Sequence, residues 1–132
     1  EAALGDYREQ VRILARAGVD FIVLEMFSRT QDLKAAIEAS TETGLPIWVG
    51  LSCESHDGQI YLGLSGRHAE ETIADAVTAS SSPNVKAFFI MHSPPQVTAD
   101  ALTELKIHTS LPIGAYAHGG SAGDEKGIAF QK

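Results

Sequence analysis

Reactive polar side chains follow each of four apolar runs in this sequence. A carboxylate, a thiol, two imidazoles and a phenol are among them, and such groups can bind an ammonium group, hold a metal ion or carry a proton. Loops at strand ends are polar in most proteins, so the pattern supports an ordinary set of loops about as well as a binding site. The residues are, in chain order, Glu25, Ser52, Cys53, His92, Ser93, Tyr116 and His118.

Glu25 is the most informative of these residues. It ends the apolar run Phe21–Leu24 and precedes Met26 and Phe27. A carboxylate in apolar surroundings is costly unless it is paired with a positive charge. We therefore expect Glu25 to bind a cationic group, such as the amino group of a ligand. The alternatives are an acid at a helix N-terminus and an ion pair with Arg29.

Cys53, His92 and His118 form a candidate metal site, because each side chain is a competent zinc ligand. They follow separate strands and lack the short spacing of a zinc motif. A lone cysteine at a strand end is more often a small buried hydrophobic residue. Zinc is therefore the weaker interpretation of these three residues.

The glycine-rich run over residues 119–121 is a second candidate for ligand binding. Its backbone amides could bind a phosphate group, as the loops after late strands do in some barrels. Glycine-rich tails are more often simply flexible, which makes a phosphate site the less favoured interpretation.

Strands and helices in alternation must position these side chains. The four apolar runs are short and rich in β-branched and aromatic residues, which is typical of parallel strands that helices cover. Gly18 and Gly44 indicate the ends of the two helices that precede the first two runs. The sequence predicts strands over residues 21–24, 47–51, 87–91 and 113–116, and helices over 7–17, 28–44, 68–79 and 93–106.

Local signals also indicate where helices begin. Ser28 with Gln31 three residues later predicts a capping box. Ser93 before Pro94 predicts an N-cap with proline at the first helical position. The stretch 54–66 is polar, and we expect it to be a loop.

Strands that alternate with helices predict a parallel sheet with right-handed crossovers. No G-x-G-x-x-G motif follows the first strand, so dinucleotide binding has no support. A complete (β/α)8 barrel needs roughly 250 residues, whereas this chain has 132. We therefore expect one partial domain over residues 1–132, with four βα units that form half of a TIM barrel or an open sheet.

Charge and composition exclude several classes of partner. The formal net charge is −7, with 10 basic against 17 acidic residues, which disfavours nucleic acid and anionic membranes. No apolar run approaches the roughly 18 residues of a membrane helix. The chain has one cysteine, hence no disulfide framework, and we expect a cytoplasmic protein.

The order of several motifs resembles the homocysteine S-methyltransferase family. Residues 17–25 are similar to that family's "AGVD-apolar-E" strand, and residues 44–53 to "GLPVW-apolar-(S/T)C". Residues 85–95 are similar to "NV-apolar-GVNC-(S/T)-PP", and residues 111–119 to "PL-apolar-YPNSG". Each motif alone is short, but the similarity covers most of the chain in the same order.

The resemblance implies a (β/α)8 barrel that transfers a methyl group to homocysteine and forms methionine. In that family three cysteine thiolates hold a zinc ion, which binds the sulfur of homocysteine as a thiolate. The resemblance implies that Glu25 holds the amino group of homocysteine, that Ser52 and Tyr116 contact the substrate, and that His92 replaces the first zinc cysteine. Cys53 matches a family cysteine that is not a ligand, and the other two ligands have no counterpart, so we expect no zinc in this chain.

Three functions follow from these observations. The first is a homocysteine S-methyltransferase-like protein, and the second is a non-catalytic relative that binds a small amino acid or acts as a scaffold. The third is an unrelated half barrel that binds phosphate through residues 119–121. Four parallel strands do not close a barrel and leave two open edges, so we expect a homodimer or larger assembly, unless helices cover both faces of an open sheet.

Overall fold

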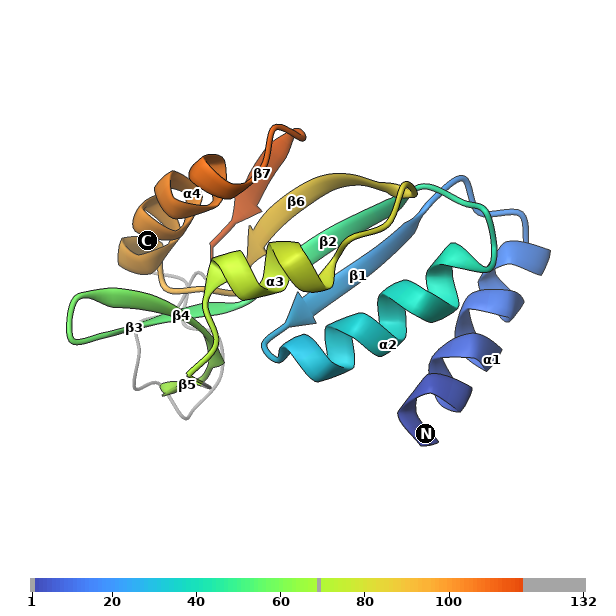
Figure 1. Cartoon of the computed structure of the whole chain (residues 1–132), viewed down its shortest axis with the longest axis horizontal. Coiled ribbons are helices and arrows are strands. Elements are labelled where there is room, and N and C mark those ends of the chain that lie inside the picture. The colour runs from blue at the N-terminus through green and yellow to red at the C-terminus, as the bar shows by residue number, and fades with distance from the viewer. Residues whose placement is uncertain (1, 69, 118–132) are drawn as a thin grey trace, which may run out of the picture.

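The computed structural model describes residues 2–68 and 70–117. Its main sheet is parallel, and the strands pair in chain order, which confirms the predicted βα architecture (Figure 1). All four predicted strands are present, each within a few residues of its expected bounds. They are β1 (Ile22–Phe27), β2 (Ile47–Leu51), β6 (Val85–Met91) and β7 (Ile113–Tyr116), in that order across the sheet.

Four helices accompany the sheet, namely α1 (Ala2–Arg16), α2 (Thr30–Thr41), α3 (Ile73–Ala79) and α4 (Pro95–His108). The helices α2, α3 and α4 cover the same face of the sheet (Figure 1). Alternate strand residues such as Leu24, Val49 and Ile90 bury their side chains against Leu33, Ile73 and Leu105 of these helices in one core. No helix in the described part of the chain is long and apolar enough to cross a membrane.

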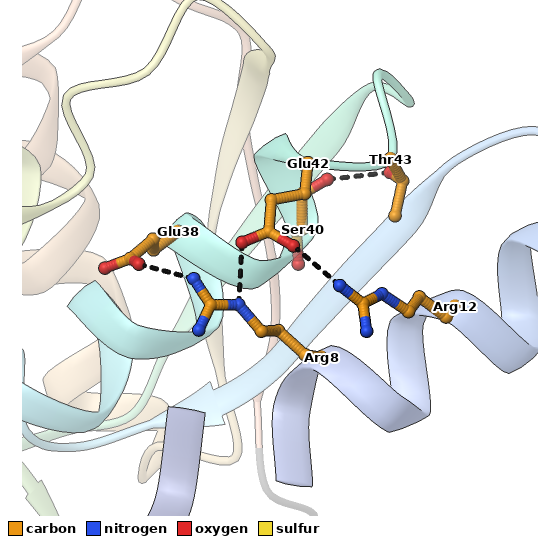
Figure 2. Close-up of polar contacts among 6 residues, drawn as sticks. All are labelled: Arg8, Arg12, Glu38, Ser40, Glu42 and Thr43. Atoms are coloured by element: carbon orange, nitrogen blue, oxygen red, sulfur yellow. Dashed lines mark hydrogen bonds and ion pairs between the residues drawn. The ribbon is translucent and has the colours of Figure 1, made fainter. Parts of the chain in front are cut away.

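The helix α1 packs beside α2 rather than on the sheet (Figure 1). Figure 2 shows the ion pairs between them: Arg8 donates to Glu42 at 2.7 Å and to Glu38 at 2.9 Å, and Arg12 lies 3.4 Å from Glu42. Exposed pairs of this kind contribute little free energy each. They fix the register of two helices whose apolar contact comes from residues such as Val11.

The other face of the sheet carries apolar side chains that the described helices leave uncovered. Phe21 stacks on Trp48 with ring centroids 4.3 Å apart, and Trp48 stacks on Phe89 at 5.4 Å. A Cβ atom on Gly114 would lie 2.6 Å from the Phe89 ring, so only glycine lets that ring lie over β7. We call Phe21, Trp48 and Phe89 the aromatic ladder. The expected alternative, with helices on both faces, is not what the described residues form.

The stretch predicted as a polar loop is instead a small antiparallel sheet. Its strands are β3 (Cys53–His56), β4 (Gln59–Leu64) and β5 (Arg67–His68). Asp57-Gly58 and Ser65-Gly66 form the two turns, and all four residues have positive φ between 50° and 76°. Two consecutive positive-φ residues are the mark of hairpin turns that match strand twist. These dipeptides were the sequence signals for the hairpins.

Two predicted helix caps are wrong, because more distant groups take their place. Ser28 does not cap α2, whose first residue Thr30 donates from its backbone nitrogen and its hydroxyl to the carboxylate of Glu71. Ser93 does not cap α4, because its hydroxyl accepts a hydrogen bond from the backbone of Cys53 at 2.9 Å. Both corrections involve partners about 40 residues away in the sequence.

The predicted helix over 68–79 begins later, at Ile73, because Arg67–His68 pair as β5. Thr72 caps it through a complete capping box with Asp75. The backbone and side-chain hydrogen bonds from Thr72 hold the pKa of Asp75 below its ordinary value. This stabilisation is present above the unfolded-state pKa of Asp75 and is lost as pH falls through the lowered value.

We expect Thr72→Ala to lower the free energy of unfolding by about 0.5–2 kcal/mol, the usual cost of a lost N-cap. Urea denaturation followed by circular dichroism measures it. Thr78→Ala changes an exposed threonine of the same helix and serves as the matched control, since it removes no cap. Equal stability of the two variants would contradict the assignment.

Candidate functional site

Three polar side chains converge at the C-terminal end of the uncovered sheet face. Glu25 lies on β1, His92 directly follows β6, and Tyr116 ends β7. The Tyr116 hydroxyl donates to Oε1 of Glu25 at 2.5 Å, and Nε2 of His92 lies 3.1 Å from the same oxygen. We call these residues the Glu25 cluster. The strand ends thus bring together three of the residues singled out in the sequence.

The contact between Glu25 and Tyr116 joins the two edges of the sheet. Two strands lie between β1 and β7, and a flat sheet would separate the edges by roughly 14 Å at 4.7–4.9 Å per strand. The side chains must therefore reach over β2 and β6. On this face Gly50 of β2 makes room for the side chain of Met91, since a Cβ atom there would lie 2.1 Å from the Met91 sulfur.

Glu25 is held as a carboxylate by its neighbours. The hydrogen bond from Tyr116, followed by that from His92, holds the pKa of Glu25 below its ordinary value. Its side chain is 58% exposed, so the expectation of apolar surroundings is wrong. Glu25 lies within a strand, not at a helix N-terminus, and the described structure pairs its carboxylate with Tyr116 and His92 rather than with Arg29.

Tyr116 is a permanent donor in this cluster. Burial, followed by the hydrogen bond to Glu25 and its negative charge, raises the pKa of Tyr116 to about 12. The phenol therefore keeps its proton at neutral pH and donates a hydrogen bond to Glu25. His92 meets the phenol ring edge-on, with centroids 5.0 Å apart and planes 81° apart.

The hydrogen-bond network assigns a proton to Nε2 of His92. An ionised carboxylate has no hydrogen to give, so the bond to Glu25 requires an N–H on the imidazole. The same nitrogen lies 3.2 Å from the Tyr116 oxygen, whose own hydrogen points to Glu25. Both neighbours of Nε2 therefore act as acceptors.

Two backbone positions beside the cluster are strained. Met26 has φ of 64° and His92 has φ of 51°. Residues other than glycine rarely adopt this left-handed region. The pairing of β1 with β2 is also irregular between Leu24 and Phe27. Such strain costs on the order of 1–3 kcal/mol per residue and gathers where side chains must be aimed. Neither position carries a sequence signal, and pattern reasoning missed both.

Ser52 and Cys53 lie apart from this cluster. Ser52 is buried, and its hydroxyl has no hydrogen-bond partner among the described residues. Cys53 is fully buried, and burial, followed by the charge of Glu54, raises the pKa of its thiol to about 12. No hydrogen bond in the described ranges joins either residue to Glu25. His118 and the run 119–121 lie outside the described residues.

The zinc that the family resemblance implies does not fit the side chains described here. A trithiolate needs three ionised cysteines, whereas the sequence has one cysteine, whose raised thiol pKa opposes ionisation. Within residues 2–68 and 70–117, no three His, Cys, Asp or Glu side chains are grouped to hold a metal ion. The described residues thus supply His92 and no trithiolate.

Comparisons with known proteins agree with the fold. The family model described as homocysteine S-methyltransferase matches residues 1–130. The apo form of the Escherichia coli homocysteine methyltransferase MmuM matches with a TM-score of 0.71 and 24% identity, over 90% of this chain and 44% of that chain.

The metallated form of MmuM matches with a TM-score of 0.71 and 22% identity, over 89% of this chain and 40% of that one. This chain therefore spans less than half the length of either MmuM chain. No curated protein matches it. With the family model matched over nearly its whole length, the chain belongs to the homocysteine S-methyltransferase family.

Proposed function

We propose that this chain binds a small α-amino acid of the homocysteine type at the Glu25 cluster, and that Glu25 holds the ligand's amino group. The observation that supports this proposal is the pair of donors on Oε1 of Glu25. They keep the group ionised and leave Oε2 for a ligand, as far as the described residues go. An exposed anion that its own protein holds in place is suited to a cationic group.

Methyl transfer to the thiol of homocysteine is the reaction that the family assignment suggests. The described residues supply no set of thiolates to activate that sulfur. We therefore propose methyl transfer only for an assembly that supplies the missing ligands. The second candidate, a non-catalytic relative that binds an amino acid or acts as a scaffold, is favoured by the histidine at position 92, where the resemblance places a zinc cysteine.

We also propose that the chain works as a single partial barrel domain in the cytoplasm and pairs with a second copy of itself. The aromatic ladder is apolar and uncovered, and the edges β1 and β7 have no further neighbour among the described strands. A two-fold axis parallel to the strands preserves their direction, so β7 of one copy could pair with β1 of the other in parallel. Two copies would supply eight strands, the number of a closed barrel.

We expect Glu25→Gln to weaken the binding of L-homocysteine by about 1–3 kcal/mol, the scale of a lost charge-assisted hydrogen bond. Gln keeps the shape of the side chain and removes the charge. Isothermal titration calorimetry measures the affinity. Glu9→Gln, at an exposed position on α1, makes the same charge change elsewhere and is the control. Equal affinity of the wild-type and Glu25→Gln proteins would rule out the role of Glu25.

We expect the isolated chain to hold no zinc after dialysis against a weak chelator. One cysteine and scattered histidines do not form a closed site. Elemental analysis of the purified protein gives the zinc content. A content near one ion per chain would contradict this expectation, and its loss in His92→Ala would identify a mixed-ligand site.

We expect light scattering at micromolar concentration to show a dimer or larger assembly. Val23→Glu places a charge on the uncovered face, where Val23 is 41% exposed, and should shift the protein to monomer. Ile13→Glu changes a residue that is 59% exposed on α1 and should leave the assembly intact. A well-folded wild-type monomer would exclude pairing between copies.

A further inference from the structure

The Glu25 cluster differs chemically from a metal site. Its fixed charge is the carboxylate of Glu25, and both nearby donors point to that carboxylate. A histidine nitrogen that carries a hydrogen cannot also coordinate a metal through the same atom. Nε2 of His92 therefore donates a hydrogen bond to Glu25, at 3.1 Å, and does not bind a metal.

We infer that His92 and Tyr116 are positioning residues for Glu25, and that the site recognises the ammonium group of an amino acid without a metal and without preference for a thiol. The inference rests on the proposed function and specifies its ligand class. That class is small α-amino acids, whether or not the side chain carries a thiol.

The first support is the way in which Glu25 is held. Tyr116 and His92 come from β7 and from the end of β6, whereas Glu25 comes from β1, so two separate segments hold a carboxylate oxygen that a third supplies. Side-chain ordering of this kind lowers the entropy that a ligand must remove on binding. The left-handed backbone at His92 and Met26 is the strain expected where such aiming is required.

The second support is the electrostatics around a bound sulfur. A thiol ionises near neutral pH only beside a cation, a metal or a helix N-terminus. The ionised group of this cluster is an anion, Glu25, and a neighbouring anion raises the pKa of a thiol. A homocysteine sulfur beside this cluster would therefore stay protonated, and it would then offer little more than a methyl group of similar size.

A metal on Nδ1 of His92 is the competing arrangement. It would leave the Nε2 bond to Glu25 intact, as in carboxylate–histidine–metal sites. Such a metal needs further ligands, and the described ranges contain no suitable group of three side chains. The two arrangements differ in their response to a chelator and to the ligand's sulfur.

Calorimetry on the full chain with L-homocysteine and L-norvaline, in which a methyl group replaces the thiol, each with and without EDTA, tests the ligand class. We expect similar affinities for the two ligands, because a protonated thiol behaves as a small apolar group, and no change with EDTA. A preference of tenfold or more for homocysteine that EDTA abolishes would overturn the inference in favour of a metal on Nδ1. Binding of neither ligand would overturn both the ligand class and the proposed function.

Carbon-detected NMR titration of the Glu25 carboxyl tests the positioning roles without any ligand. The wild-type pKa should lie below its ordinary value, and Tyr116→Phe and His92→Ala should each raise it. His92→Gln should restore the low value, because its amide keeps an N–H donor at similar reach. Tyr61→Phe, which removes the hydroxyl that bonds Gln59, is the matched control and should leave the Glu25 pKa unchanged.

The two measurements fail independently. If the Glu25 pKa is the same in Tyr116→Phe and His92→Ala as in the wild type, and the protein still binds the amino acids, the positioning roles are overturned. The proposed function would then still stand. The positioning roles would be supported if Tyr116→Phe and His92→Ala bind the ligand more weakly while circular dichroism shows the wild-type fold. Recovery of affinity in His92→Gln would distinguish positioning from a merely structural role.

Discussion

The hydrogen bond between Tyr116 and Glu25 ties together the two edges of the parallel sheet. It forms only if the side chains of the edge strands meet above the strands between them. On the same face, Met91 occupies the space above Gly50 and Phe89 the space above Gly114. The site therefore depends on the curvature and pairing of all four strands, because its residues come from both edges of the sheet.

The two faces of the sheet have different roles, one in stability and the other in the candidate site. Helices bury alternate strand residues in one continuous core, which supplies the apolar burial that stabilises the domain. The other face carries the aromatic ladder and, at the C-terminal ends of the strands, the Glu25 cluster. Because neighbouring residues of a strand point to opposite faces, Leu24 belongs to the core while Glu25 belongs to the site.

Much of the fold was predictable because its signals are local. Apolar, β-branched runs bounded by glycine and proline locate each strand of the main sheet. The hairpins of residues 53–68 were missed because their polar side chains hide the alternation, although Asp57-Gly58 marks a turn. The predictions of caps at Ser28 and Ser93 failed for another reason. The carboxylate of Glu71 accepts the hydrogen bonds at the start of α2, and the Ser93 hydroxyl accepts one from the backbone of Cys53. No short sequence pattern reveals such distant partners.

The site was predictable in its location but not in its contacts. Parallel strands place their C-terminal ends together, which is why Glu25, His92 and Tyr116 could be named in advance. The surroundings of Glu25 were misjudged, because Met26 and Phe27 are its neighbours in sequence but do not enclose its carboxylate. The left-handed backbone of Met26 and His92 follows from tertiary packing, which no residue-by-residue preference encodes.

The burial of Cys53 makes this thiol a natural reporter of the protein's opening motions. It is the single cysteine of the chain, it is fully enclosed by the core, and its thiol keeps its proton far above neutral pH. An alkylating reagent can reach it only in molecules whose core has opened. The rate of labelling then measures how often the core around Cys53 opens, on a wild-type chain and without any introduced probe.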